Sequence, residues 1–220
     1  MFLQIPDVLT ATEVATVRQL AQRARFVDGR TTNPHNIAKV NVIADQSDPA
    51  AQQATQVAFA ALQRCEPAMN FALPQRIAPP QLCRYGVGQT YGAHTDAAFL
   101  AVGPQALRSD VSCTLFLSDP ASYQGGELTI YLGSEAVRVK GTPGSAVLYP
   151  STTLHEVAPV STGERLVMIT FIQSRIPDQM HRDLLYKLGE VRALEALKLD
   201  WENRTHLEHV IANLQRMWSG

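Results

Sequence analysis

The chain has 220 residues, 45% hydrophobic residues and a formal net charge of −1. This length and hydrophobic content suit one compact domain with an appendage. The balanced charge, without a long basic run, argues against nucleic acid or an anionic membrane as a partner. The chain shows no basic leader and no stretch that could span a membrane, so we expect a cytoplasmic protein that acts on a small molecule or a peptide.

Two helices are predicted in the N-terminal third. Thr10 and Glu13 have the spacing of a capping box, and apolar residues at helical intervals predict a helix over about 12–25. Asp48, as an N-cap before a first-turn proline, predicts a second helix that reaches Cys65. The polar segment between them contains His35, which we expect to be exposed rather than to lean over a site.

Short β-like runs between turn signals fill the middle of the chain. Pro143 and Gly144 fit a type II turn, which predicts a hairpin between the runs on either side. The stretch 97–110 is expected to be an irregular lid or substrate-recognition loop, with a plain connection as the alternative. Helices followed by many strands favour a barrel or double sheet supported by helices. The predicted strands lie at about 81–85, 111–117, 127–132, 136–140, 145–149 and 166–172.

The C-terminal part differs in composition from the rest. From Pro177 onward it is charged, nearly free of Gly and Pro, and periodic in apolar residues, which predicts two or three helices. We expect these helices to pack on the sheet or on another subunit, and an exposed apolar face on them would favour a homodimer. Three histidines of this part are interpreted as surface or interhelical residues: His181, His206 and His209.

The cysteines indicate neither a disulfide framework nor a zinc knuckle. Cys65, Cys83 and Cys113 are odd in number, widely separated and without a Cys-x-x-Cys pair. We expect reduced, mostly buried thiols.

Two histidines and one aspartate have the spacing of a metal site. His94 and Asp96 are two residues apart, so in an extended segment both side chains point to the same side. His155, 61 positions after His94, would complete three ligands from a distant strand. Two imidazoles and one carboxylate with open positions are typical of non-haem Fe(II) oxygenases. The short motif alone is weak, because a His-x-Asp arises easily by chance.

Arg165 follows His155 by ten positions and opens the apolar run RLVMITFI. Both faces of this run are largely apolar, so we expect a strand that is covered on both sides. A guanidinium in such an interior is costly unless it is paired, and its planar shape suits a carboxylate. Two interpretations stay open from the residues alone: capture of a dicarboxylate ligand, or a strand-end arginine that reaches solvent or a structural glutamate.

Four blocks of the sequence resemble a known family. In order and spacing they are similar to the bacterial PKHD-type hydroxylases, which are Fe(II)/2-oxoglutarate-dependent dioxygenases related to the prolyl 4-hydroxylases. The blocks are RYGVGQTYGAHTD, TLFLSDPASYQGGEL, GSAVLYPSTTLHEVAPVSTGERL and FIQSRIPD, and the likeness covers nearly the whole chain.

The resemblance implies a mainly β fold with flanking helices, of the α+β class. Its core would be a distorted double-stranded β-helix, or jelly roll, over 77–176. Residues 1–76 would form a helical and β support region, and 177–220 a helical extension.

The resemblance also implies the roles of the site residues. His94, Asp96 and His155 would bind Fe(II), and Arg165 would bind the distal carboxylate of 2-oxoglutarate. The implied reaction uses O2 to convert 2-oxoglutarate into succinate and CO2 and hydroxylates a C–H bond, with L-ascorbate as a reductant. The substrate is not implied, although a link to iron and siderophore uptake is.

Further residues near the co-substrate are less certain from the pattern. Tyr85 and Tyr91 stand where the wider group places tyrosines beside the co-substrate, and a buried core aromatic is the alternative for each. Some relatives have a tyrosine that assists the arginine on the strand that reads CTLFLS here. Either Thr114 or a tyrosine elsewhere therefore assists Arg165, or Arg165 works alone.

Two other classes of protein stay open. A zinc-dependent hydrolase could use the same three ligands, but Glu156, the nearest candidate base, would point away from His155 in a strand, and Arg165 would have no role. A non-catalytic jelly-roll binding protein would not need an intact ligand set.

Overall fold

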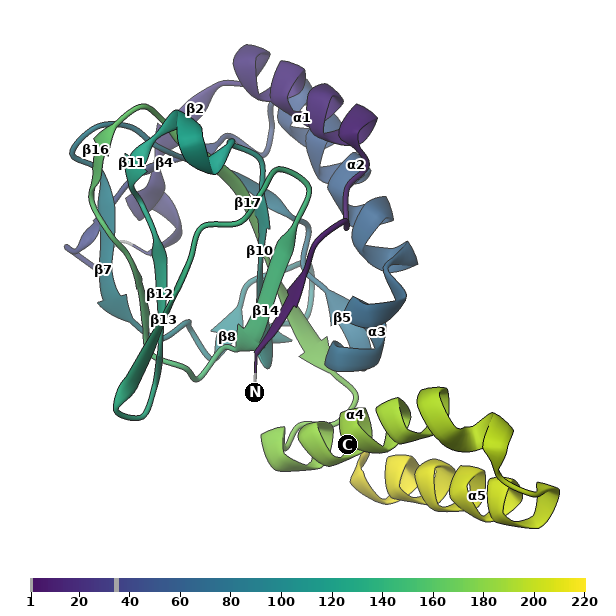
Figure 1. Ribbon diagram of the computed structural model, residues 1–220. Coiled ribbons are helices and arrows are strands. Elements are labelled where there is room, and N and C mark those ends of the chain that lie inside the picture. The colour runs from purple at the N-terminus through teal and green to yellow at the C-terminus, as the bar shows by residue number, and fades with distance from the viewer. Residues whose placement is uncertain (1, 34–35) are drawn as a thin grey trace.

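The computed structural model describes residues 2–33 and 36–220. Within these residues the chain forms five α-helices, three short 3₁₀ helices and two main β-sheets, with a helical hairpin projecting from the rest (Figure 1). The mainly β fold with flanking helices agrees with the fold class predicted from the sequence. His35, which we expect to be exposed, lies outside the described residues.

The larger sheet has eight antiparallel strands, with three helices along its outer face (Figure 1). The helices are α1 (Ala11–Arg23), α2 (Pro49–Arg64) and α3 (Glu66–Ala72). Their apolar sides and the outward side chains of the sheet form one hydrophobic core. The strand order is β1 (Leu3–Ile5), β14 (Ala146–Pro150), β10 (Val111–Phe116), β17 (Arg165–Ser174), β6 (Gln81–Tyr85), β4 (Val42–Ala44) and β2 (Phe26–Asp28), with β5 (Pro74–Ile77) also paired to β17.

The smaller sheet has five strands, and a second hydrophobic core joins its side chains to those of the larger sheet. Two-stranded ribbons and 3₁₀ helices connect the parts. The smaller sheet has the order β13 (Glu135–Val139), β12 (Leu128–Leu132), β15 (His155–Val157), β7 (Thr90–His94) and β3 (Lys39–Val40). The ribbons are β11 (Gln124–Gly125) with β16 (Val160–Thr162) and β8 (Phe99–Leu100) with β9 (Leu107–Arg108), and the 3₁₀ helices are η1 (Gly29–Thr32), η2 (Pro120–Ser122) and η3 (Ala196–Lys198).

Strand β17 lies between β10 and β6 and is covered on both sides, as its apolar faces predict. Leu166 and Met168 belong to the core under the helices, whereas Val167 belongs to the core between the sheets. By the same alternation Arg165 shares the inner face with Val167. The strand therefore carries a charged group into the interior between the sheets.

Helix caps form where the sequence predicts them. The Thr10 hydroxyl accepts from the Glu13 amide and the Glu13 carboxylate accepts from the Thr10 amide, so the capping box is confirmed. Asp48 caps α2 ahead of Pro49, also as predicted. Helix α3 is not predicted by the sequence analysis, because its seven residues give too short an apolar period.

All six predicted strands are present, and their ends agree to within two residues. The hairpin predicted at Pro143 and Gly144 is nevertheless wrong. The turn itself forms, with the Ser145 amide donating to the Thr142 carbonyl. However, β13 pairs with β12 in the smaller sheet and β14 pairs with β10 and β1 in the larger one, so the turn carries the chain from one sheet to the other.

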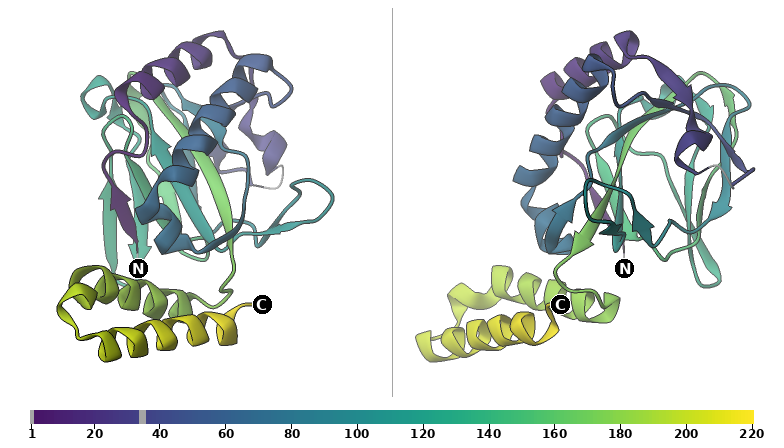
Figure 2. Two further views of the ribbon diagram at one scale, coloured as in Figure 1. Left: turned by 90° about the vertical axis from the view of Figure 1, so that its right-hand side faces the viewer. Right: turned by 180° about the vertical axis from the view of Figure 1, so that it is seen from behind.

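The C-terminal helices α4 (Gln179–Glu195) and α5 (Trp201–Trp218) form a hairpin below the sheets, and α4 packs against α3 (Figures 1 and 2). The His181 ring stacks on Trp218 with 4.1 Å between ring centroids, so it is an interhelical residue as interpreted. The three cysteines are free and buried, as predicted. No helix within the described ranges is both long and apolar enough to cross a bilayer.

Candidate active site

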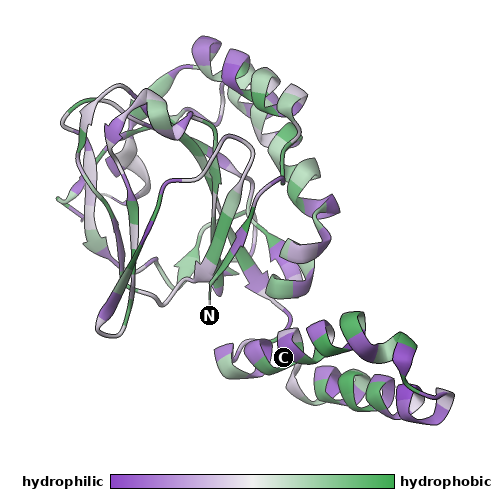
Figure 3. Ribbon diagram, viewed as in Figure 1, coloured by the Kyte–Doolittle hydropathy of each residue, from purple (hydrophilic) through white to green (hydrophobic). Residues whose placement is uncertain are grey.

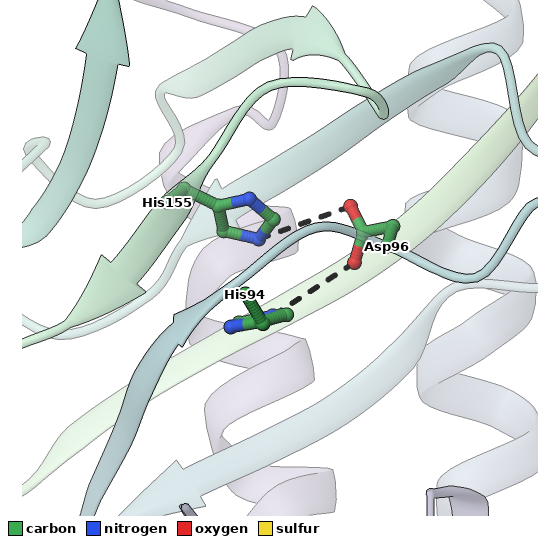
Figure 4. A group of neighbouring side chains, drawn as sticks. All are labelled: His94, Asp96 and His155. Carbon is green, nitrogen blue, oxygen red and sulfur yellow. Dashed lines mark ion pairs between the residues drawn. The ribbon is translucent and has the colours of Figure 1, made fainter. Parts of the chain in front are cut away.

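Two histidines from strands of the smaller sheet and one aspartate from the segment after β7 converge between the sheets. His94 ends β7, Asp96 follows two residues later, and His155 begins β15. Figure 4 shows the three side chains facing one another. The Nε2 atoms of His94 and His155 lie 4.0 and 3.8 Å from the Oδ1 and Oδ2 atoms of Asp96, respectively. Their ligand atoms all lie within 4.8 Å of one another, which is the arrangement expected around one ion.

A β-bulge lets β7 present two aromatic rings to the same interior. His94 pairs with His155 and Tyr91 pairs with Val157, so three steps along β7 match two along β15. Residues three apart in a regular strand face opposite sides, but a bulge restores a common side. The Tyr91 ring therefore stacks on His94, with 3.5 Å between ring centroids.

Backbone carbonyls fix which imidazole nitrogens are free. His94 Nδ1 lies 2.7 Å from the Gly92 carbonyl oxygen, and His155 Nδ1 lies 2.9 Å from the Thr153 carbonyl oxygen. Because a carbonyl only accepts, both Nδ1 atoms carry the proton, and both Nε2 atoms keep a lone pair. Metal-binding histidines are commonly oriented in this way.

Burial shifts the pKa values of His94 and Asp96 in ways that favour binding of a cation. Burial lowers the pKa of His94 to about 4, with the nearby His155 acting in the same sense, so the His94 ring is neutral at pH 7. Burial also raises the pKa of the Asp96 carboxyl, against the opposing effects of His155 and of the Ser112 hydroxyl. A buried carboxyl beside the neutral His94 ring is stabilised by a nearby positive charge, which a divalent cation would supply.

Arg165 lies in the same interior with 2% of its surface exposed. Its guanidinium lies over the Tyr85 ring at 5.0 Å, and its positive charge lowers the pKa of the neighbouring Tyr123 hydroxyl against the larger, opposite effect of burial. Its Nε atom has no hydrogen-bond partner within the described part of the chain. Arg165 is therefore a buried cation with an unused donor, not a strand-end arginine that reaches solvent.

One narrow cavity joins the three candidate ligands to Arg165. It offers about 40 Å³ to water-sized molecules, so side chains must shift to admit a diacid. Thr114 lines it together with Arg165, without a hydrogen bond between the two side chains in the described part of the chain. The other lining residues include Tyr85, Tyr91, Ser112, Tyr149 and Ile169.

Comparison with known proteins identifies the family. Residues 80–173 match the model of the 2OG-Fe(II) oxygenase superfamily. The chain is 46% identical over 216 residues to a PKHD-type hydroxylase of Sphingopyxis alaskensis, covering 98% of each chain. The chain belongs to the PKHD-type hydroxylases. It is therefore an oxygenase of the hydroxylase class, and the family implies Fe(II), 2-oxoglutarate and O2.

Solved structures share the fold of this PKHD-type hydroxylase. A Pseudomonas putida prolyl-4-hydroxylase superposes with a TM-score of 0.56 at 21% identity, over 79% of this chain and 92% of that one. A Trichoplax adhaerens prolyl hydroxylase, solved with a hypoxia inducible factor peptide fragment, gives 0.58 at 18% identity, over 83% and 86% of the two chains.

Two residues at the site of this PKHD-type hydroxylase, Tyr123 and Lys39, have no individual role predicted from the sequence. Tyr123, which contacts Arg165, is a tyrosine from outside the strand CTLFLS, one of the alternatives left open by the sequence. Lys39 is 5% exposed, donates to Thr32 Oγ1 at 2.6 Å and lies 5.3 Å from the centre of the Tyr91 ring. Only the pairing of β3 with β7 brings Lys39 here, and two residues of strand give no sequence signal.

The stretch 97–110 is not the irregular loop that the sequence analysis expects. It contains the β8–β9 ribbon, which pairs Phe99 with Arg108. Arg76 of β5 donates to the carbonyl oxygens of Val102, Gln105 and Ala106 at 3.0 to 3.2 Å. The ribbon is thus tied to the larger sheet, and a role as a lid stays a prediction.

A wider crevice of about 540 Å³ lies between α3, β5 and α5, away from these residues. Its walls include Met69, Ile176, Arg175 and Arg216, without a histidine or a carboxylate. It lacks the groups for metal or acid-base chemistry, so the smaller cavity is the candidate active site.

Proposed function

We propose that the protein is an Fe(II)- and 2-oxoglutarate-dependent dioxygenase in which His94, Asp96 and His155 bind the metal and Arg165 binds the distal carboxylate of 2-oxoglutarate. The observation that carries the proposal is the pairing of a three-ligand cluster with a buried guanidinium in one cavity. Neither group has an evident structural use without a ligand. Together they match a metal and a dicarboxylate.

Each residue has a separate task in this proposal. The bound metal supplies activation of O2 for hydroxylation of the substrate. Arg165 fixes the far end of the co-substrate through its free donors, while Tyr85 and Tyr123 hold the guanidinium in place. Thr114 and Tyr91 form walls of the co-substrate cavity. The protein thus orients the reactants and excludes bulk water.

The two other classes gain less support. A zinc hydrolase needs a general base beside the metal, and the nearest candidate, Glu156, accepts a hydrogen bond from the Tyr131 hydroxyl at 2.9 Å. A binding protein without catalysis gives no reason for two histidines held with Nε2 free. The oxygenase uses all of these features.

The rest of the proposal concerns the surroundings of the site. We propose a distorted jelly roll over 77–176, a support region over 1–76 and a helical extension over 177–220. The substrate is a small molecule or a peptide, supported for the peptide by the Trichoplax adhaerens relative that was solved with one. A cytoplasmic location agrees with three free thiols. L-ascorbate as reductant and a link to iron or siderophore uptake rest on the resemblance alone.

We propose that the projecting hairpin pairs with a second copy of the chain. Three of its large exposed apolar residues are Leu194, Leu197 and Trp201, with 71, 84 and 79% of their surfaces exposed. They lie around the turn between α4 and α5, a segment that Figure 3 colours partly as hydrophobic. A two-fold arrangement would bury this patch on both copies at once.

The direct test is the formation of succinate from 2-oxoglutarate by the purified protein with Fe(II) in air. We expect slow turnover without added substrate, and none with Zn(II) in place of Fe(II). His155→Ala should abolish it, whereas His206→Ala, on the exposed part of α5, should not. Equal succinate from the wild type and His155→Ala would refute the assignment.

A further inference from the structure

The Asp96 carboxylate is held by two buried serines that the sequence analysis does not single out. Ser112 Oγ donates to Asp96 Oδ2, and Ser151 Oγ lies 2.7 Å from Ser112 Oγ. Only 3% of Ser112 and 2% of Ser151 is exposed. An ionised carboxylate only accepts, so the single proton of Ser112 points to Asp96 and Ser151 donates to Ser112. The two hydroxyls form a directed chain that ends on one carboxylate oxygen.

The backbone fixes both ends of this chain. The Asp96 amide donates to the Ser151 carbonyl at 3.2 Å, and the Ser151 amide donates to the Asp110 carbonyl at 3.1 Å. Ser112 stands on β10, between β14 and β17 in the larger sheet. Asp96 instead follows β7 of the smaller sheet. Through the serine pair, the Asp96 carboxylate, which follows a strand of the smaller sheet, is hydrogen bonded to a central strand of the larger sheet.

The two oxygens of Asp96 consequently differ. Each oxygen faces one imidazole, Oδ1 that of His94 and Oδ2 that of His155, but only Oδ2 also receives the Ser112 hydroxyl. Six-coordinate Fe(II) with two imidazoles and one carboxylate oxygen keeps three open positions, of which a chelating 2-oxo acid takes two. If Asp96 bound through both oxygens, no position would stay free. The orientation of the Asp96 carboxylate therefore decides whether a position for O2 stays open once the metal and the 2-oxo acid are bound.

We propose that Ser112, supported by Ser151, is a positioning residue that limits Asp96 to binding the metal through one oxygen. The proposal rests on the proposed function for the identity of the metal and the co-substrate. It explains why two hydroxyls are buried beside a carboxylate that already faces two imidazoles. It also assigns a role to the inner face of β10 at the metal end of the cavity, opposite to the Arg165 end.

The test compares Ser112→Ala with Ser112→Thr, which keeps the hydroxyl, and with Ser109→Ala. Ser109 is a matched control, because it is also buried but its hydroxyl has no partner among the described residues. Each protein is loaded with Co(II) and 2-oxoglutarate without O2. The visible absorption of Co(II), which depends on coordination number and geometry, and a crystal structure then give the binding mode of Asp96.

In the wild type, Ser112→Thr and Ser109→Ala we expect one Asp96 oxygen on the metal. In Ser112→Ala we expect both oxygens on the metal, a changed Co(II) spectrum and succinate formation with Fe(II) reduced about 10- to 100-fold. One-oxygen binding in Ser112→Ala, or turnover within about twofold of the wild type, would overturn the proposal. The melting temperature separates misfolding from these effects, and if Ser112→Thr misfolds, Ser151→Ala should give the same change to a smaller extent.

These outcomes are distinguishable from failure of the proposed function. If wild-type protein makes no succinate with Fe(II), the dioxygenase assignment fails. The binding mode of Asp96 on Co(II) still tests the role of Ser112 in that case.

Discussion

Arg165 contributes a positive charge to the interior that no carboxylate within the described residues neutralises by an ion pair. The rings of Tyr85 and Phe116 lie beside the guanidinium, and the Tyr123 hydroxyl is near it, but the Nε atom has no hydrogen-bond partner among the described residues. Burying an incompletely paired guanidinium opposes folding. Such an arrangement is understandable where a ligand completes the pairing.

We therefore predict that Arg165→Ala weakens 2-oxoglutarate binding by at least about tenfold, because a charge-assisted hydrogen bond is worth about 1.5–3 kcal/mol. Arg165→Lys should recover part of this loss, since it keeps the charge but not the planar fork. Calorimetric titration of the Mn(II)-loaded protein measures the affinity.

The control for Arg165 is Arg84→Ala. Arg84 lies on the neighbouring strand β6, but it donates to the Ala21 carbonyl of α1 and stacks on Phe26, away from the cavity. The Arg84→Ala variant should therefore bind 2-oxoglutarate with the affinity of the wild type. Equal losses in both variants would mean that the effect comes from damage to the sheet.

The buried thiols give a second prediction at this scale. Burial raises the pKa of Cys83 to about 11 and that of Cys113 to about 12. Because the thiolate is the reactive form, both stay protonated and inert at pH 8 in the native state. A thiol reagent followed by peptide mass spectrometry should label neither residue before denaturant is added, and all three cysteines afterwards. Labelling of Cys83 or Cys113 in native protein would contradict this packing.

At the scale of elements, the positions of the long strands can be predicted from the sequence, because alternating side chains and turn residues mark where each strand begins and ends. Strand β17 and the capping box of α1 are examples, and both depend on local interactions. Which strands pair with each other cannot be predicted from these local patterns. Strand β13 pairs with β12 and not with β14. Val139 of β13 belongs to the core between the sheets, whereas β14 also supplies Ala146 and Leu148 to the core under the helices, so the two strands lie in different sheets.

The same distinction holds at the site. The candidate ligands and Arg165 follow from spacing, but Lys39, Ser112 and Tyr123 meet them only through the facing of two sheets. No local sequence pattern predicts that these three residues meet the candidate ligands or Arg165.

The β8–β9 ribbon gives a prediction for a single element. Arg76 makes three hydrogen bonds to its carbonyls, so Arg76→Ala should loosen it while the larger sheet stays intact. Hydrogen exchange should become faster over 99–108 and stay unchanged in β10 and β17. Gln75→Ala is the control, since the neighbouring Gln75 side chain accepts a hydrogen bond from the Gln173 side-chain amide of β17 and makes none to the ribbon within the described residues. Equal exchange in the two variants would show that Arg76 does not hold the ribbon.

At the scale of the whole molecule, the proposed pairing through the projecting hairpin predicts a dimer, which can be tested in solution. If the hairpin pairs two copies, sedimentation should give a dimer for the wild type and a monomer for Leu197→Glu with Trp201→Glu, because both changes place a charge on the exposed apolar patch. Both residues stand at the turn between α4 and α5, which projects away from the sheets (Figure 1). Succinate formation should persist in the monomer. A wild-type protein that stays monomeric at high concentration would remove the proposed interface.

The most direct measurement for the whole account is an anaerobic titration of the Fe(II)-loaded protein with 2-oxoglutarate. Chelation of Fe(II) by a 2-oxo acid produces a weak visible charge-transfer band. We predict that the band appears only when both are present, saturates at one 2-oxoglutarate per chain, and needs higher concentrations in Arg165→Ala. A protein that binds Fe(II) but shows no band at saturating 2-oxoglutarate would contradict the assignment of this site.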